Sequence, residues 1–248
     1  MKITVIGGTG FIGSRLVTEL RNAGHEAVPA SPSSGVDLLT GAGLDEALAG
    51  AHTVVNVSNS PTFDDRSLAF FRTTVGNLLA AGERAGVGHQ VALSIVGVDR
   101  VPGLDYYRAK VLQEDLLRGG PTPYSIVRAT QFFEFMDPTI AMTADDNAVR
   151  LPATPVQPIA GADVVDALAG VATSAPLNGT LDIAGPDVFT LDELARITLA
   201  ARKDERPVIT DDRAGMFAAV EGDVLTAGPD ARLAPTHYRD WLATTLAG

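Results

Sequence analysis

Short apolar runs alternate with helical patterns of apolar residues across roughly the first 130 residues of the chain. This alternation is typical of βαβ units, and therefore of a parallel sheet covered by helices. The predicted strands are residues 2–6, 26–30, 36–38, 53–57, 90–95 and 124–128, and the predicted helices are residues 11–23, 44–48, 64–85, 106–118 and 131–143. The pattern therefore predicts an α/β fold.

The pattern changes after about residue 145, because residues 151–158 contain three prolines and predict a loop or edge segment. Beyond it, we expect a helix that Thr190 opens, with Glu193 completing a capping box. We predict one domain over residues 1–150, continuing in part after 150, and a small lobe over 151–248. The other elements predicted here are helices over 162–173 and 235–246 and strands over 179–184 and 207–209.

A glycine-rich turn joins the first predicted strand to the first helix, with glycines at positions 7, 10 and 13. The first permits a tight turn, the second lets bare backbone approach a ligand, and the third lets the helix pack closely on the sheet. The helix start adds unpaired N–H groups and about half a positive charge. We therefore predict a Rossmann-like, doubly wound sheet that binds a dinucleotide, although an ordinary glycine-rich turn is the alternative. The expected contacts are Gly7, Thr9, Gly10, Phe11, Ile12 and Gly13.

Composition narrows the possible functions. The net charge of −11 argues against nucleic-acid binding, which needs clustered Lys and Arg. The chain has no cysteine, which excludes disulfides and thiol catalysis. Its four histidines are scattered without ligand spacing, so we expect no metal. No apolar run is long enough for a signal or membrane segment, so we expect a cytoplasmic protein without membrane contact.

A tyrosine and a lysine, Tyr106 and Lys110, stand four residues apart on a predicted helix and so share one face. A phenol titrates near pH 10, and a nearby ammonium stabilises the phenolate. Tyr106 is therefore a candidate to exchange a proton with a carbonyl oxygen during hydride transfer. Ser94, at the end of a predicted strand, is a candidate to polarise a substrate oxygen. The alternatives are a surface Tyr–Lys pair and an ordinary turn serine.

The glycine turn and these three residues together resemble the short-chain dehydrogenase/reductase superfamily. Residues 106–111 and 126–133 are similar to its atypical or extended NAD(P)H-binding branch, close to NmrA-like proteins, and residues 161–165 and 182–186 resemble that branch's substrate lobe. The resemblance covers essentially the whole chain. It implies a Rossmann fold in which Tyr106 is the acid/base, Lys110 holds the cofactor ribose and Ser94 contacts the substrate oxygen.

The loop after the second strand bears on the choice of cofactor. Residues 31–34 contain neither an acidic nor a basic residue, and hydroxyls with backbone amides can accept a 2′-phosphate, so NADP(H) is favoured over NAD(H). Arg15 is a possible aid, and a plain polar loop is the alternative. The expected contacts along the cofactor are Ser31, then Asp37 and Leu38 at the adenine, then Asn56, Val57 and Ser58, with Lys110, Ala129 and Thr130 toward the nicotinamide.

The substrate is expected to be a small, hydrophobic carbonyl compound or alcohol. Gln131, Phe132 and Phe133 follow the sixth strand, where the resemblance places the substrate wall, although any single one is as readily a core residue. The chain departs from the family pattern at residues 70–74, which lack the usual relay Asn, and at residues 128–129, where Arg-Ala replaces Arg-Pro.

Three functions fit these observations. The first is an NAD(P)H-dependent oxidoreductase, the second is a redox-sensing regulator that binds NADP without turnover, and the third is a nucleotide-sugar epimerase or dehydratase. The missing relay Asn favours the second, whereas the intact Tyr–Lys pair favours the first. The predicted helices 64–85 and 106–118 are long enough to pair between two subunits, so a homodimer is possible.

Overall fold

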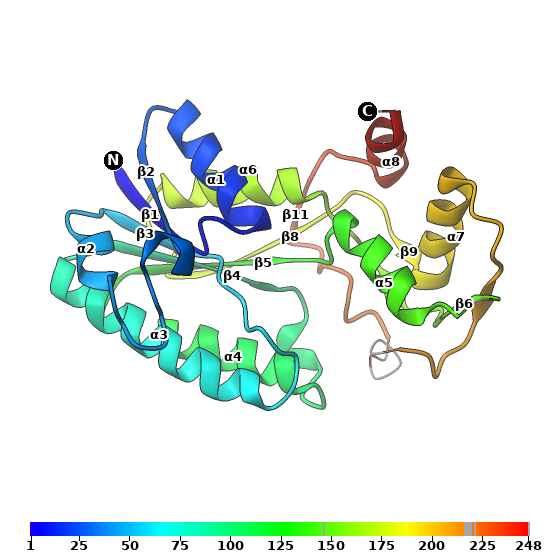
Figure 1. Cartoon of the computed structure of the whole chain (residues 1–248), viewed down its shortest axis with the longest axis horizontal. Coiled ribbons are helices and arrows are strands. Elements are labelled where there is room, and N and C mark those ends of the chain that lie inside the picture. The colour runs from blue at the N-terminus through cyan, green and yellow to red at the C-terminus, as the bar shows by residue number, and fades with distance from the viewer. Residues whose placement is uncertain (146, 216–219, 221, 248) are drawn as a thin grey trace. The chain divides into compact units, whose positions relative to one another are not determined.

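The computed structural model describes residues 1–145, 147–215, 220 and 222–247, and its elements are drawn in Figure 1. A seven-stranded sheet has the order β11-β8-β5-β4-β3-β1-β2. β1 pairs in parallel with β2 and with β3, and β3 pairs in parallel with β4. The strands of this sheet are β1 (Lys2–Ile6), β2 (Glu26–Ala30), β3 (Thr53–Asn56), β4 (His89–Ile95), β5 (Tyr124–Ala129), β8 (Gly179–Ala184) and β11 (Arg232–Leu233).

Eight α-helices belong to the described residues. They are α1 (Phe11–Asn22), α2 (Leu44–Leu48), α3 (Arg66–Ala85), α4 (Asp105–Arg118), α5 (Met136–Thr143), α6 (Gly161–Ala172), α7 (Leu191–Arg202) and α8 (Tyr238–Ala247). Two small sheets pair β6 (Val149–Leu151) with β10 (Val208–Thr210) and β7 (Pro155–Val156) with β9 (Phe189–Thr190). Within the part of the chain that the structure describes, none of the helices has the length and apolar character needed to cross a membrane.

The chain divides into two compact units. Unit 1 comprises residues 1–128 and 164–181, and unit 2 comprises residues 129–163 and 182–248. The chain therefore leaves unit 1 earlier than the predicted boundary at residue 150 and returns to it through α6.

Unit 1 is a Rossmann-like α/β layer structure, as the sequence predicted. The strand order places β2 on one side of β1 and β3 with β4 on the other, which is the doubly wound arrangement. The helices α3 and α4 lie side by side on one face of the sheet, and α1 and α6 lie on the other face (Figure 1). The two long helices thus pack against each other within a single chain.

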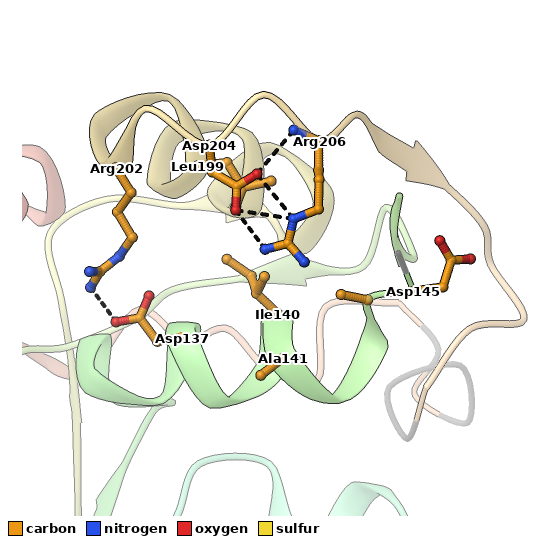
Figure 2. Close-up of a pocket in the computed structure, with 9 residues that line it drawn as sticks. Asp137, Ile140, Ala141, Asp145, Leu199, Arg202, Asp204 and Arg206 are labelled. Atoms are coloured by element: carbon orange, nitrogen blue, oxygen red, sulfur yellow. Dashed lines mark hydrogen bonds and ion pairs between the residues drawn. The ribbon is translucent and has the colours of Figure 1, made fainter. Parts of the chain in front are cut away.

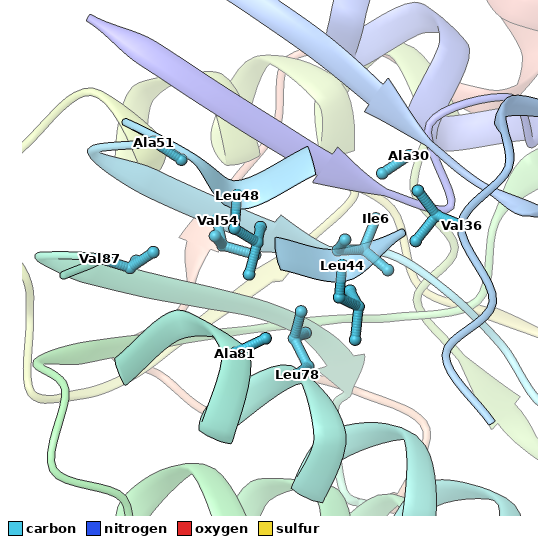
Figure 3. Close-up of a cluster of buried hydrophobic side chains, with 10 residues drawn as sticks. All are labelled: Ile6, Ala30, Val36, Leu44, Leu48, Ala51, Val54, Leu78, Ala81 and Val87. Atoms are coloured by element: carbon cyan, nitrogen blue, oxygen red, sulfur yellow. The ribbon is translucent and has the colours of Figure 1, made fainter. Parts of the chain in front are cut away.

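A buried cluster at the β2 end of the sheet shows how a short helix contributes to this core (Figure 3). Leu44 and Leu48, at the two ends of α2, are 1 % and 0 % exposed. Their side chains pack with residues of β1, β3 and α3, so this one-turn helix seals the sheet edge. The cluster consists of Ile6, Ala30, Val36, Leu44, Leu48, Ala51, Val54, Leu78, Ala81 and Val87.

Two predicted elements and one predicted helix cap are among the predictions that differ from the structure. No strand forms over residues 36–38, because the Asp37 carboxylate accepts the Leu39 N–H at 2.8 Å and bends the chain. The helix predicted over 131–143 begins only at Met136, after a 3₁₀ turn, η3 (Phe133–Phe135). The predicted capping box at Thr190 does not form either, since the Thr190 hydroxyl donates to Asp192 at 2.6 Å.

Candidate functional site

The glycine turn closes tightly between β1 and α1. Gly7 has φ of +79°, which glycine adopts without strain, and its carbonyl accepts a hydrogen bond from the Gly10 N–H at 3.0 Å. A Cβ on Gly13 would lie 2.1 Å from the Gly7 carbonyl oxygen, so this position requires glycine. Among the described residues, no side chain caps α1 at Gly10. The first N–H groups of α1 are therefore available to an anion, and the turn fits a dinucleotide pyrophosphate.

The loop after β3 lies directly against this turn. A Cβ on Gly7 would approach the Ser58 backbone nitrogen to 3.0 Å. The Asn56 Oδ1 atom accepts hydrogen bonds from the Ser58 N–H at 3.0 Å and from the Ser58 hydroxyl at 2.7 Å. The Val57 N–H donates to the Ile6 carbonyl at 3.0 Å. The structure thus brings the predicted residues of the two loops together at the carboxyl ends of β1 and β3.

A group of hydroxyls forms where the glycine turn meets the loop after β2. The Thr9 hydroxyl donates to the Ser31 hydroxyl at 3.1 Å, and the Ser31 and Ser33 hydroxyl oxygens lie 3.0 Å apart. This loop forms a short 3₁₀ helix, η1 (Pro32–Ser34). Arg15 turns back on its own helix, where its guanidinium lies 4.1 Å from the Phe11 ring centroid. Neutral donors therefore surround Ser31.

The segment that contains Asp37 and Leu38 is fixed from two sides. The Asp37 carboxylate accepts the Leu39 N–H at 2.8 Å, and this hydrogen bond lowers the pKa of Asp37. From α3, the Asn77 amide donates to the Leu38 carbonyl at 2.9 Å and to the Leu39 carbonyl at 3.1 Å. The predicted adenine contacts are thus held in place by α3.

Tyr106 meets the loop after β3 at its hydroxyl. The hydroxyl donates to the Asn59 Oδ1 atom at 2.6 Å. The ring of Phe63, from the same loop, lies edge-on to the Tyr106 ring with centroids 4.9 Å apart. Burial raises the pKa of Tyr106 to about 12, which is opposite to the direction predicted from its neighbouring lysine. The hydroxyl is therefore protonated at neutral pH.

Lys110 shares α4 with Tyr106 but points into the protein. It is 4 % exposed, and its ammonium donates to the Leu93 carbonyl at 2.7 Å and to the Gln113 side-chain oxygen. The Phe71 ring centroid lies 5.1 Å from the Nζ atom. Burial lowers the pKa of Lys110 to about 7. Lys110 therefore changes charge near neutral pH.

Ser94 lies deep beside an ion-pair network. It is 4 % exposed, and its hydroxyl favours the charged form of Glu114 without reaching hydrogen-bond geometry with any described residue. Glu114 receives two hydrogen bonds from the Arg128 guanidinium at 2.8 and 2.7 Å and a third from Arg118 at 2.8 Å. Arg128 also reaches Asp99 at 3.2 Å. The role of Ser94 toward a substrate stays a prediction.

The remaining predicted residues, Ala129, Thr130, Gln131, Phe132 and Phe133, belong to unit 2. Phe133 is 2 % exposed and packs against Tyr238 and Trp241, with ring centroids 5.0 and 5.4 Å apart. Phe133 is thus a core residue. Phe132 stacks instead on Phe135, with centroids 5.2 Å apart, and Phe135 is 52 % exposed.

The residues next to this aromatic group are held by backbone contacts within unit 2. The Thr130 N–H donates to the Ile183 carbonyl at 3.1 Å, and Ala129 precedes it at the end of β5. The Gln131 carbonyl accepts the Ile159 N–H at 2.9 Å, and the Gln131 Oε1 atom is buried without a partner among the described residues. Gln131 therefore has an unused acceptor.

Unit 2 also contains a cavity of about 400 Å³ between α5 and α7 (Figure 2). Four of its five charged side chains pair with one another: Arg206 lies 2.5 Å from Asp204, and Arg202 pairs with Asp137. None of the predicted site residues lines it. The lining residues are Asp137, Ile140, Ala141, Ala144, Asp145, Leu199, Arg202, Asp204 and Arg206. The described residues contain no group of three acidic or histidine side chains placed to hold a metal ion.

Sequence reasoning missed Asn59 and the partners of Lys110. Asn59 follows the predicted residues 56–58 directly, so extending the polar run after β3 by one residue would have found it. Gln113 and Glu114 are polar residues at positions of α4 that face the core. Polar residues in the apolar stripe of an amphipathic helix indicate a buried polar group, and this pattern could have been used to find them.

Comparison with known proteins agrees with this geometry. Residues 7–174 match the family described as NAD(P)H-binding. No curated protein matches the sequence.

Three solved structures illustrate the likeness in fold. Triphenylmethane reductase from Citrobacter sp. is 16 % identical, with a TM-score of 0.78 and 100 % of both chains covered. An NADPH-dependent quinone oxidoreductase from Escherichia coli is 15 % identical, with a TM-score of 0.73 and coverage of 98 % of this chain and 99 % of that one. A nucleoside-diphosphate-sugar epimerase from Staphylococcus aureus is 17 % identical, with a TM-score of 0.74 and coverage of 98 % and 99 %.

Proposed function

Because the chain belongs to the NAD(P)H-binding family, we propose that it is an oxidoreductase that transfers hydride between NADP(H) and a small, hydrophobic carbonyl compound or alcohol. The observation that carries this proposal is the position of the Tyr106 hydroxyl. It hydrogen-bonds to Asn59, in the loop whose first residues lie against the glycine turn. A proton donor and a dinucleotide site therefore belong to the same unit.

The cofactor, when bound, supplies or accepts the hydride. The glycine turn and the start of α1 would hold its pyrophosphate, and the hydroxyls around Ser31 would hold the phosphate of the adenosine ribose. The other residues of unit 1 proposed to contact it are Asp37 and Leu38 at the adenine, Asn56, Val57 and Ser58 in the loop after β3, and Lys110 toward the nicotinamide.

Tyr106 would act as the proton donor for carbonyl reduction. A phenol with a pKa of about 12 keeps its proton at neutral pH and passes it to an alkoxide that forms at the substrate. Asn59 would orient the Tyr106 hydroxyl, since the Asn59 Oδ1 atom accepts a hydrogen bond from that hydroxyl before the proton is transferred. The raised pKa favours reduction over alcohol oxidation, which requires the phenolate.

Replacing Tyr106 by Phe tests this role. Turnover of a carbonyl substrate should fall by about 10²–10⁴-fold, because the substrate oxygen loses its proton donor, while NADPH affinity stays within two-fold. The matched control is Tyr124→Phe, whose ring packs in a core cluster with Leu117 and Ile126. Unchanged turnover in Tyr106→Phe would refute the role.

The proposed preference for NADP(H) rests on the cluster of hydroxyls formed by Thr9, Ser31 and Ser33. A carboxylate there would repel a 2′-phosphate and accept a hydrogen bond from a 2′-hydroxyl. We therefore expect Ser33→Asp to weaken NADPH binding at least ten-fold and to leave NADH binding equal or tighter, as measured by fluorescence titration. Equal losses for both cofactors would contradict the assignment of this loop.

A regulator that binds NADP without turnover is the second candidate. It is favoured by the hydrogen bonds of the Lys110 ammonium, which go to the Leu93 carbonyl and the Gln113 side chain, whereas the Tyr106 hydroxyl bonds to Asn59. Tight NADPH binding without NADPH consumption across a broad carbonyl panel would select this function. Cofactor that copurifies and is never consumed would instead indicate an epimerase-type cycle.

A further inference from the structure

Phe63 is a large apolar side chain displayed beside the proposed proton donor. It is 62 % exposed, and its ring meets the edge of the Tyr106 ring at 68° with centroids 4.9 Å apart. Another exposed ring of unit 1, Phe11, is covered by the Arg15 guanidinium at 4.1 Å. The Phe63 ring contacts the Tyr106 ring itself, so its exposed surface adjoins the candidate reaction centre.

The loop holds Phe63 in this position from both sides. The Ser67 hydroxyl, on a residue with 0 % exposure, donates to the Thr62 carbonyl at 2.6 Å. On the other side, the Arg66 side chain and backbone bind the Asp64 carboxylate at 2.6 to 3.1 Å. These bonds order the residues that flank Phe63 while the ring contributes little to the core. Ordering a ring outside the core is the arrangement expected of a ligand contact.

The same loop supplies a polar group next to the ring. The Asn59 Oδ1 atom accepts the Tyr106 hydroxyl at 2.6 Å and the Ser60 N–H at 2.9 Å. A ligand that reaches Tyr106 therefore meets a hydrogen-bonding pair at one point and an aromatic ring beside it. A flat, conjugated molecule with a carbonyl oxygen at its edge satisfies both, because rings stack or pack edge-to-face within about 4.5–7 Å.

We infer that Phe63 is a specificity-determining residue that selects planar, conjugated carbonyl acceptors, such as quinones and aryl ketones, over flexible aliphatic ones. This inference rests on the proposed function for the reaction itself. For a quinone, the balance is two electrons and two protons: a hydride comes from the reduced nicotinamide and a proton comes from the Tyr106 hydroxyl. The products are the hydroquinone and the oxidised cofactor, and the Tyr106 phenolate regains a proton from water.

The test compares two acceptors of equal carbon count, 1,4-naphthoquinone and decanal, in the wild type, Phe63→Leu and Leu39→Ala. Phe63→Leu keeps the apolar bulk and removes the ring, and Leu39 is a 53 % exposed side chain elsewhere in unit 1. We expect Phe63→Leu to lower kcat/KM for naphthoquinone by about three- to ten-fold and for decanal by less than two-fold. Leu39→Ala should leave the ratio of the two unchanged.

A calorimetric titration of NADP⁺-loaded protein with 1,4-naphthoquinone separates this inference from the proposed function. If the wild type binds the quinone and Phe63→Leu binds it at least three-fold more weakly, the inference stands even when neither acceptor is turned over. Equal losses for both acceptors, a weaker affinity for NADPH in Phe63→Leu, or no change in quinone binding would each overturn it. Absence of turnover in the wild type would count against the proposed function alone.

Discussion

Lys110 is a cationic side chain enclosed by a strand, a helix and an aromatic ring. Burial lowers its pKa from 10.5 to about 7 in the folded protein. Between these two values the unfolded chain binds a proton that the folded chain does not, so stability rises as the pH increases from about 7 toward 10.5. His89, whose pKa falls from 6.5 to about 4, titrates below this window, whereas Tyr106 and Tyr238, whose pKa rises from 10.0 to about 12, lower the stability only as the pH passes about 10.

We expect Lys110→Met to abolish this rise. The methionine keeps much of the buried side chain and carries no titratable group, so the free energy of unfolding should become flat from about pH 7 until the tyrosines begin to titrate near pH 10. Urea unfolding at several pH values between 7 and 10 measures it, with Lys203→Met, an exposed lysine, as the control. A slope that persists in Lys110→Met would show that another group carries the proton.

Substitutions at Asn59 test how much the orientation of the Tyr106 hydroxyl contributes to turnover, because they leave the proton donor itself in place. Asn59→Ala removes the acceptor of the 2.6 Å hydrogen bond, so the hydroxyl is free to rotate. We expect kcat to fall about ten-fold with the KM for NADPH unchanged. Asn59→Asp keeps an acceptor and adds negative charge, which further favours the protonated phenol and moves the alkaline limb of the pH–rate profile upward. Equal profiles in the two variants would indicate a purely structural asparagine.

At the residue scale, the sequence indicated Tyr106 and Lys110 through their spacing, since one helical face was enough to relate them. It could not indicate how far each is buried, because burial depends on Phe71 and Leu93, which lie distant in sequence. For this reason the predicted direction of the Tyr106 pKa was opposite to the one found. Asn59 was missed because its partner is separated from it by 47 positions.

At the scale of elements, α4 is joined to β5 by a buried ion pair. Glu114 has a fully buried side chain, and that of Arg128 is 12 % exposed. Burial raises the pKa of Glu114, but the hydrogen bonds and charge of Arg128, together with Ser94 and the charge of Arg118, outweigh it and hold that pKa below its usual value. The pair therefore fixes the helix that carries Tyr106 against the sheet.

Removing one of the two charges of this ion pair should lower the free energy of unfolding. Arg128→Met leaves the Glu114 carboxylate with Arg118 alone, and a buried charge without its partner costs about 3–5 kcal/mol. Removing both charges in Arg128→Met with Glu114→Leu should recover more than half of that loss, since no charge is then left buried. Urea unfolding of the three variants measures the coupling. Additive losses in the double variant would contradict it.

Elements whose signal is local were predictable. The helix over 44–48 was predicted with its observed bounds, because Leu44 and Leu48 lie on one buried side of a single turn. The prediction of a strand over residues 36–38 was wrong, because the Asp37 carboxylate accepts the Leu39 N–H and closes a turn there. Side-chain to backbone bonds of this kind are invisible to periodicity.

At the scale of the whole molecule, the α/β class and doubly wound order followed from the alternation of elements. The sequence also indicated that the first domain continues in part after residue 150, but not that residues 129–163 belong to unit 2 or that residues 164–181 are the part that returns to unit 1. Nothing in the local pattern of α6 differs from that of a lobe helix. Its place is set by distant partners, such as the Thr53 hydroxyl, which donates to the Ala172 carbonyl at 3.1 Å.

Because residues 164–181 belong to unit 1, fragments of the chain with and without them should differ in stability. Residues 1–150 lack α6 and β8, so the face of the sheet that α1 and α6 cover loses α6, and the Tyr124 carbonyl loses the hydrogen bond that it accepts from the Asn178 N–H at 2.7 Å. We expect this fragment to show no cooperative thermal transition by circular dichroism and no NADPH binding. Residues 1–185 retain every part of unit 1 and should show both. A cooperative, NADPH-binding 1–150 fragment would mean that α6 is dispensable and that the dinucleotide-binding domain ends where the composition changes.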